Sequence, residues 1–223
     1  MHCIVTAGPT FEKLDDVRRL TNFSTGRLGS ELANFLAARG HAVTLLIGEQ
    51  ATWPGERRAD RVETFSTTAD LRDRLRGFAG QSVDAVFHAA AVSDFTFGKV
   101  WLRAPGGELT EAKAGKISTR EGTLLAELVP TAKVIAEMRD WFPKALLVGW
   151  KYEVDGDRST VVEAARKQIA DCRTDACVAN GAAYGEGFGV VSARGDLTHC
   201  QEKDSLFDVL GRLVAAAARI RSE

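Results

Sequence analysis

The sequence predicts an α/β protein built on a doubly wound, mainly parallel sheet with helices on both faces. Short β-rich apolar runs alternate with amphipathic stretches of helical period, which is the pattern of successive strand, helix and strand units. Most of these runs are continuously apolar, as expected of parallel strands that are covered on both faces. The chain has 223 residues, of which 45% are hydrophobic, so we expect a single domain over residues 1–223 with a substantial core.

Four strands are expected in the first half of the chain. They are the runs CIVTAG, HAVTLLIG, RVETFST and DAVFHAAAV, at residues 3–8, 41–48, 61–67 and 84–92. Between the first two, apolar residues recur at helical spacing from Leu28 to Leu36, and Gly40 ends the helix. A second helix is expected at residues 70–78, capped by Thr68. Right-handed crossovers then give parallel pairing.

Strands one and four are neighbours in the default order 3-2-1-4 of a Rossmann-like sheet, and the direction in which successive strands are added reverses between them. Ligands bind in the crevice outside the carboxyl ends of strands at such a switch point. We therefore expect the segments AGPT, STGRLG and AAAVSDF to surround one crevice. They span residues 7–10, 24–29 and 89–95.

Residues 95–120 show no sustained period and contain one proline and several glycines. Connections of this length without regular structure usually mark a mobile binding loop or a disordered excursion, and we interpret this one as a long, mobile flap. After it, strands are expected at residues 123–129, 145–154, 175–181 and 189–195, with a helix at 131–141. A capping box of Thr160 and Glu163 opens a further helix, and a last amphipathic helix ends the chain.

Composition narrows the functional class. The 29 basic and 30 acidic residues nearly cancel, so the chain offers no electrostatic footprint for nucleic acid or a membrane surface, and small-molecule partners are expected. No leader precedes the first strand and no apolar run is long enough to span a bilayer, so a cytoplasmic location is expected. The four cysteines lack metal-ligand spacing and are interpreted as ordinary buried or half-buried thiols.

The stretch TNFSTGRLGSELA, from Thr21, is a candidate anion-binding turn. Its glycines allow the backbone to approach a ligand, and the N-terminus of the following helix directs free N–H groups at an anion. Beyond the fourth strand, Asp94 either holds a magnesium ion against nucleotide phosphates or caps a turn. Lys116 in the flap either neutralises charge on a triphosphate or is solvated. His88, at the end of the fourth strand, is either a core residue or a crevice residue.

Several ordered blocks resemble one family. The opening VTAGPTFEKLDDVRRLTNFSTGRLG resembles the pattern TAGPT, D-x-V-R and N-x-S-[ST]-G-x-x-G of phosphopantothenoylcysteine synthetases. HAAAVSDF, GKIS, VGWKYE and CVANG resemble later blocks of that family, in the same order and at similar spacing. The resemblance covers nearly the whole chain. The same family is also described as the C-terminal domain of DNA/pantothenate metabolism flavoproteins, which this chain therefore also resembles.

The resemblance implies a phosphopantothenate–cysteine ligase of the monofunctional type, acting in coenzyme A biosynthesis. Such a ligase joins 4'-phosphopantothenate to cysteine through an acyl-nucleotide. The implied co-substrate is CTP or ATP and the implied cofactor is Mg²⁺, with no flavin because the decarboxylase half is expected on another chain. Family members pair through their sheets, so a homodimer is also implied.

The resemblance also assigns roles by matched position. Asn22 and Lys116 are the implied catalytic residues, and Arg18 joins Asn22 in binding substrate. Asp94 is the implied metal ligand. Trp150 stands where the family has a phenylalanine near the nucleoside base. The implied nucleotide-binding residues are Gly8, Ser24, Thr25, Gly26, Ala89, Ala90, Asp94, Lys116, Lys133, Trp150 and Lys167.

Two departures from the family pattern leave the choice of nucleotide open, and a third, at a strand-end motif, leaves open whether the chain is a working enzyme or a diverged relative. The K-x-K-K motif of bifunctional enzymes is here Lys-Ile-Ser-Thr, so only Lys116 is retained. Cys172 stands where a lysine that reads a pyrimidine is expected, and the strand-end motif A-N-D is here Ala-Asn-Gly. The serine after Lys-Ile and the lysine after Trp150 are closer to monofunctional synthetases, so ATP is as credible as CTP.

Two other classes of function remain open on the sequence. A nucleotide-binding regulatory or diverged non-catalytic relative would keep the turn but release no pyrophosphate from its substrates. A nicotinamide-dependent short-chain reductase is disfavoured, because the chain has no Tyr-x-x-x-Lys pair and its glycines follow the first strand too late.

Overall fold

The computed structural model describes residues 1–112, 115–118 and 122–222. Its main sheet has eight strands in the order β13-β12-β11-β10-β6-β1-β4-β5. These strands are β1 His2–Ala7, β4 Ala42–Gly48, β5 Arg61–Phe65, β6 Ala85–His88, β10 Leu146–Tyr152, β11 Ala176–Asn180, β12 Phe188–Ser192 and β13 Leu197–Cys200. The part β5-β4-β1-β6 is the expected order 3-2-1-4, which confirms the doubly wound reading. Only the pairs β11 with β12 and β12 with β13 are antiparallel within this sheet.

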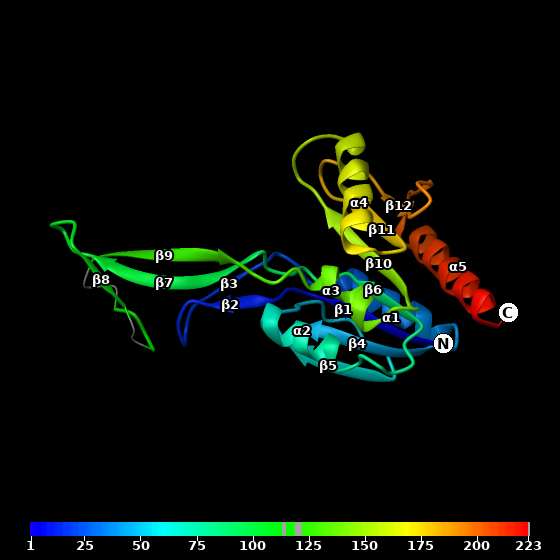
Figure 1. Ribbon diagram of the computed structural model, residues 1–223, viewed down its shortest axis with the longest axis horizontal. Helices are drawn as coiled ribbons and strands as arrows, with labels where there is room; N and C mark the ends of the chain where they lie inside the picture. Colours follow the sequence, from blue (N-terminus) through cyan, green and yellow to red (C-terminus); the bar gives the residue numbers. More distant parts are fainter. Residues whose placement is uncertain (113–114, 119–121, 223) are drawn as a thin grey trace.

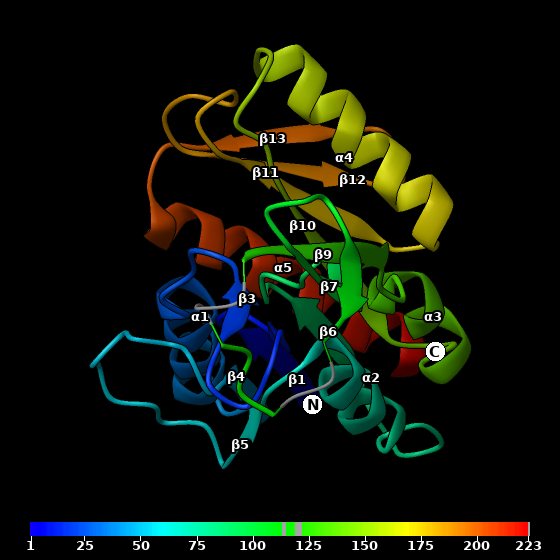
Figure 2. The ribbon, with the colours of Figure 1, turned by 90° about the vertical axis from the view of Figure 1, so that its left-hand side faces the viewer.

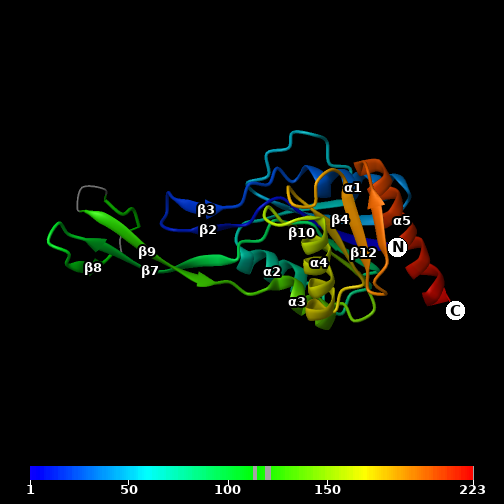
Figure 3. The same cartoon turned by 90° about the horizontal axis from the view of Figure 1, so that it is seen from above.

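Helices cover both faces of the sheet, as expected (Figures 2 and 3). Their bounds are α1 Arg27–Ala38, α2 Thr68–Arg76, α3 Val134–Trp141, α4 Arg158–Cys172 and α5 Lys203–Ser222. Alternate residues of β1 point to opposite faces. Val5 packs in the core under α1 and α5, whereas its neighbour Ile4 packs in the core under α2 and α3. A third core cluster joins α4 to the far strands β11 and β12.

An antiparallel arm projects from the body of the molecule (Figure 1). Its strands are β7 Phe95–Arg103, β8 Leu109–Glu111 and β9 Thr123–Pro130, in the order β8-β7-β9. The expectation that residues 95–120 lack regular structure is therefore wrong for β7 and β8, and residues 113–114 and 119–120 of that range lie outside the described residues. Most arm side chains are exposed or half-buried, so neither face of the arm is a core face and the sequence shows no apolar alternation.

A short hairpin fills the interval between the first strand and the first helix, which the sequence left unassigned. Strands β2 Phe11–Lys13 and β3 Arg19–Thr21 pair antiparallel. Glu12 is buried, and its carboxylate accepts a hydrogen bond of 2.9 Å from the backbone N–H of Thr68 at the start of α2. This contact fixes the root of the hairpin against the main body.

Two predicted caps fall at other residues. Thr67, not Thr68, caps α2: its side chain accepts from the N–H of Asp70 at 3.2 Å, while Thr68 is already helical and buried. The sequence offers two adjacent threonines, and only their backbone angles decide between them.

The capping box of α4 also begins earlier than expected, at Asp157 with Thr160. Glu163 is instead ion-paired with Arg166 on the helix surface. The apolar residues Val162, Ala165 and Ile169 nevertheless face the core, as expected.

All four cysteines are buried free thiols. Burial raises the pKa of Cys3 and of Cys177 to about 12, so both thiols are neutral and unreactive at physiological pH. Among the helices of the described chain, none is long and apolar enough to cross a membrane.

Candidate functional site

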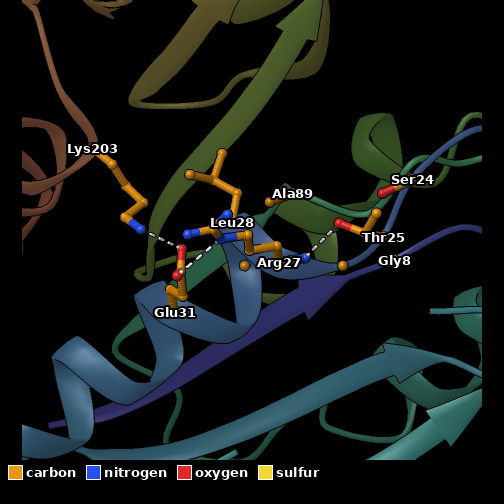
Figure 4. Close-up of a pocket in the computed structure, with 10 residues that line it drawn as sticks. Gly8, Ser24, Thr25, Arg27, Leu28, Glu31, Ala89 and Lys203 are labelled. Carbon is orange, nitrogen blue, oxygen red and sulfur yellow. Dashed lines mark hydrogen bonds and ion pairs between the residues drawn. The ribbon is translucent and has the colours of Figure 1, made fainter. Parts of the chain in front are cut away.

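A pocket of about 270 Å³ lies at the carboxyl ends of β1 and β6, where the sheet direction switches (Figure 4). Its lining residues are Gly8, Ser24, Thr25, Gly26, Arg27, Leu28, Gly29, Glu31, Ala89 and Lys203. Five of the predicted nucleotide-binding residues are thus brought together here: Gly8, Ser24, Thr25, Gly26 and Ala89.

Three glycines let the turn and helix α1 approach the sheet closely. Gly8 and Gly26 both have left-handed backbone angles, with φ of 77° and 76°. A Cβ at Gly26 would stand 2.8 Å from the Cδ1 of Ile47 and 3.0 Å from the Cβ of Ala51. At Gly29 it would stand 2.6 Å from the Cβ of Ala7 in β1. These positions therefore require glycine.

The N-terminus of α1 is open to a ligand. Gly26 is the capping residue, and within the described chain no side chain forms a cap hydrogen bond there. The N–H of Arg27 donates to the hydroxyl of Thr25 at 3.3 Å, a long hydrogen bond. The remaining N–H groups of the first turn, together with the helix dipole, favour an anion at this end.

Three charged side chains line the pocket. Glu31 accepts a hydrogen bond of 3.1 Å from the Nε of Arg27 and forms an ion pair of 2.7 Å with the Nζ of Lys203. Burial opposes ionisation of Glu31, but the hydrogen bonds from Lys203 and Arg27 outweigh it, so the pKa of Glu31 lies below its ordinary value. Two cations against one carboxylate leave the group with a net positive charge.

Sequence reasoning missed all three of these residues. Arg27 and Glu31 carried a local signal, because opposite charges four residues apart on a helix are neighbours. Lys203 carried none, since it reaches the pocket from α5, near the other end of the chain.

Backbone hydrogen bonds hold the end of β6 against β1. Ala89 donates to the carbonyl of Thr6 at 3.2 Å, and Ala90 donates to its hydroxyl at 3.1 Å. His88 shares a hydrogen bond of 2.9 Å with that same hydroxyl, and burial lowers its pKa to about 4. His88 is therefore a neutral core residue.

Asn22 lies beside the pocket rather than in its lining. The side-chain amide donates to the carbonyl of Ala91 at 3.1 Å, and Ala91 in turn donates to the carbonyl of Gly8 at 3.0 Å. Asn22 is thereby held exposed next to the turn that follows β6.

Arg18 and Lys116 belong to a separate cluster at the turn between β2 and β3. Arg18 donates to Asp15 through Nε at 3.0 Å and to the carbonyl of Ile117 through Nη2 at 2.8 Å. The N–H of Ile117 donates to the carboxylate of Asp15 at 3.3 Å. Since these bonds hold the residue after it, exposed Lys116 is fixed near the hairpin and lies outside the pocket lining.

The other predicted site residues also lie outside the lining. Asp94 is exposed just before β7, and Lys133 is exposed where α3 begins. Lys167 is on the outer surface of α4, paired with Asp171 at 3.1 Å. Trp150 packs half-buried against the core under α1 and α5.

The donor set does not build a metal centre of its own. Within the described residues, no group of three or more histidine, cysteine, aspartate or glutamate side chains is placed to hold an ion. Asp94 is a single exposed carboxylate, and Glu31 is engaged by Arg27 and Lys203. Mg²⁺ is commonly bound by one or two carboxylates together with substrate phosphates, and Asp94 fits only that kind of role.

Comparison with known proteins shows what this arrangement resembles. The family model described as the DNA/pantothenate metabolism flavoprotein C-terminal domain matches residues 1–218. The coenzyme A biosynthesis bifunctional protein CoaBC of Thermococcus kodakarensis is 33% identical over 178 residues, which are 79% of this chain and 40% of that protein. CoaBC of Bacillus subtilis is 32% identical over 189 residues, 84% of this chain and 42% of the relative. The chain thus spans about two fifths of the length of these curated relatives.

Solved structures share the fold. The DNA/pantothenate metabolism flavoprotein of Streptococcus pneumoniae is 25% identical with a TM-score of 0.82, over 97% of this chain and 99% of that chain. A Cab2 mutant in complex with phosphopantothenate-cysteine is 18% identical with a TM-score of 0.69, over 98% of this chain and 86% of that chain. The second likeness shows the fold alone.

Proposed function

Because this chain belongs to the DNA/pantothenate metabolism flavoprotein C-terminal domain family, we propose that it is a phosphopantothenate–cysteine ligase of coenzyme A biosynthesis. The observation that carries the proposal is the pocket itself. It combines an uncapped helix N-terminus with two cations at the switch point of a doubly wound sheet. Such a site is built for the phosphates of a nucleotide.

The reaction proceeds in two displacements. A carboxylate oxygen of 4'-phosphopantothenate attacks the α-phosphorus of CTP or ATP, and the bond to the β-phosphate oxygen breaks to release pyrophosphate. The amine of cysteine then attacks the acyl carbon of the acyl-nucleotide. Nucleoside monophosphate leaves, the amine loses a proton, and an amide remains. Neither step demands strong acid or base catalysis, so orientation and charge neutralisation supply most of the rate.

The turn and helix α1 bind phosphate in this scheme. Gly8, Ser24, Thr25, Gly26 and Ala89 belong to the lining, and the N–H of Ala90, next to Ala89, donates to the hydroxyl of Thr6. Asn22, held by the carbonyl of Ala91, presents its amide beside the pocket to a phosphoryl or carboxylate oxygen. The expected contributions of Trp150 and Lys167 to base recognition and of Lys133 to nucleotide binding remain predictions, as does the choice between CTP and ATP.

Mg²⁺ would be supplied with the nucleotide, whose phosphate charge it neutralises when bound. Asp94 is the proposed carboxylate for such an ion. Arg18 is proposed to bind the substrate, and Lys116 to neutralise charge on the triphosphate. The hydrogen bonds of Arg18 and Ile117 to Asp15 hold Arg18 and the residue next to Lys116 at the hairpin.

We also propose a homodimer. Large apolar side chains are exposed on the hairpin and around it, notably Val17, Leu20 and Phe23, and on the arm at Phe95 and Leu128. Exposed apolar residues gathered on two projecting elements are typical of an association surface. Sedimentation of the purified protein would test this directly.

The test of the ligase is release of pyrophosphate with 4'-phosphopantothenate, cysteine and Mg²⁺, using CTP and ATP separately. We expect release that depends on phosphopantothenate and on one nucleotide, and a fall of at least about tenfold in Asn22→Ala, because one oriented donor is lost. Asn34→Ala is the matched control, since the Asn34 amide also donates to a backbone carbonyl, that of Glu56, but on the outside of α1. No release with either nucleotide, despite tight nucleotide binding, would favour a non-catalytic nucleotide-binding relative.

A further inference from the structure

Lys203 is the first residue of α5 and reaches the pocket from the far end of the chain. We propose that Lys203 binds the pyrophosphate portion of the nucleoside triphosphate, and that Glu31 is its internal counter-ion, which positions Lys203 and Arg27 and limits how tightly pyrophosphate is retained. The proposal rests on the proposed function for the identity of the nucleotide. It adds Lys203 as a phosphate-binding residue and Glu31 as a residue that positions it.

The geometry places both cations on one carboxylate. One oxygen of Glu31 meets the Nε of Arg27 at 3.1 Å and the other meets the Nζ of Lys203 at 2.7 Å (Figure 4). The side chain of Glu31 is 19% exposed, whereas those of Arg27 and Lys203 are 61% and 32% exposed. The acid is therefore largely covered, while each cation keeps surface with which to meet a ligand.

Both cations occupy positions that helix stability disfavours. Arg27 and Lys203 are the first residues of α1 and α5, and the N-terminal end of a helix carries partial positive charge. Within the described chain, the first turn of α1 contains no acidic residue to offset this, whereas that of α5 contains Asp204 beside Lys203. Arg27 and Lys203 therefore bring two cations to two positive helix ends with one shared carboxylate, Glu31, between them, an arrangement that suits a polyanion.

A purely structural role is already served elsewhere. Arg39, just after α1, is paired with Asp208 of α5 at 2.9 Å, so these helices are joined by an ordinary one-to-one ion pair outside the pocket lining. The apolar face of α5, with Leu206 and Leu210 fully buried, seats the helix in the core. The pair of Lys203 with Glu31 is therefore not needed to dock α5.

The proposal makes opposite predictions for the two partners. Removing the positive charge of Lys203 deletes a charge-assisted contact to phosphate and weakens binding. Removing the negative charge of Glu31 frees both cations for the ligand and strengthens binding. A residue pair that merely supported the fold would weaken binding in both variants.

The experiment is calorimetric titration of the purified protein with inorganic pyrophosphate, CTP, ATP and the two nucleoside monophosphates. We expect Lys203→Gln to weaken the binding of pyrophosphate and of the preferred triphosphate about tenfold or more, and to change the affinity for the monophosphates little. Lys203→Arg should keep most of the affinity. Glu31→Gln should bind pyrophosphate several-fold more tightly and release it more slowly in a stopped-flow chase.

Arg39→Gln and Asp208→Asn are the matched controls, since they remove the same charges from the other pair that joins α1 and α5. Circular dichroism establishes that each variant is folded. Pyrophosphate affinity unchanged in Lys203→Gln, or lowered equally by Arg39→Gln, overturns the binding role. Weaker binding by folded Glu31→Gln overturns the counter-ion role.

These titrations need no ligase chemistry. If the wild-type protein shows the expected binding pattern but no substrate-dependent pyrophosphate release, the proposed ligase function fails and the pyrophosphate site stands. If the protein is an active ligase whose Lys203 variants bind pyrophosphate as the wild type does, the proposed role of Lys203 is wrong and the ligase function is retained.

Discussion

Replacing Gly26 by alanine tests whether the turn is as tightly built as its geometry indicates. An alanine held in the left-handed backbone conformation of Gly26 lowers the free energy of unfolding by about 1–2 kcal/mol for that conformation alone. Its Cβ would also stand 2.8 Å from the Cδ1 of Ile47 and 3.0 Å from the Cβ of Ala51. Overpacking of a core costs roughly 1–3 kcal/mol, so we expect Gly26→Ala to lower the free energy of unfolding by roughly 2–5 kcal/mol.

Gly40 supplies the matched control. It has a similar φ, 79°, but a Cβ added there would meet nothing within 4 Å. Gly40→Ala therefore isolates the backbone cost of about 1–2 kcal/mol. Urea unfolding followed by circular dichroism measures the free energy of unfolding of both variants. Calorimetric titration measures their affinity for pyrophosphate. If Gly26→Ala destabilises the protein no more than Gly40→Ala, or binds pyrophosphate as the wild type does, the turn is not as tightly packed as the distances to Ile47 and Ala51 indicate.

Three further predictions concern single groups. The hydrogen bond from Arg18 holds the pKa of Asp15 well below its ordinary value, so ionised Asp15 stabilises the fold above about pH 4 and this stabilisation is lost as the pH falls. In urea unfolding, the free energy of unfolding of Asp15→Asn should therefore fall less between about pH 5 and 2.5 than that of the wild type. Burial lowers the pKa of His88 to about 4, so stability should fall as the pH drops from about 6.5 to 4, and an NMR titration with a midpoint near 6.5 for His88 would contradict this. Thr67→Ala should cost about 1 kcal/mol through the lost cap of α2, and no change in the unfolding midpoint would mean that the hydrogen bond to Asp70 contributes nothing.

Much of the main body is predictable from local pattern. Continuous apolar runs mark strands that are covered on both faces, and a helical period marks the face that each helix buries. Together with the right-handed crossover rule, these patterns give the order β5-β4-β1-β6 and the switch point between β1 and β6. The glycines at 8, 26 and 29 mark the turn in the same way, because only glycine tolerates such close approach.

The arm shows where the pattern carries no information. Strands β7 and β8 bury neither face within the chain, so hydrophobic alternation is absent and the segment reads as an irregular flap. Their pairing depends on backbone hydrogen bonds to residues farther along or back in the chain. Adjacent threonines posed a similar problem at α2, since composition alone does not distinguish Thr67 from Thr68 as the cap.

The sequence alone is enough to predict the parallel strands of the main sheet, the buried faces of the helices and the glycine turn, because each of these depends on neighbours within a few residues. Only the tertiary structure decided which charges meet at that turn. Lys203 joins Arg27 and Glu31 because α5 packs beside α1, and the local pair of Arg18 with Asp15 meets Ile117 because the hairpin lies against the segment around Lys116. Charge pairing between distant segments depends on distance in space, and no local periodicity records it.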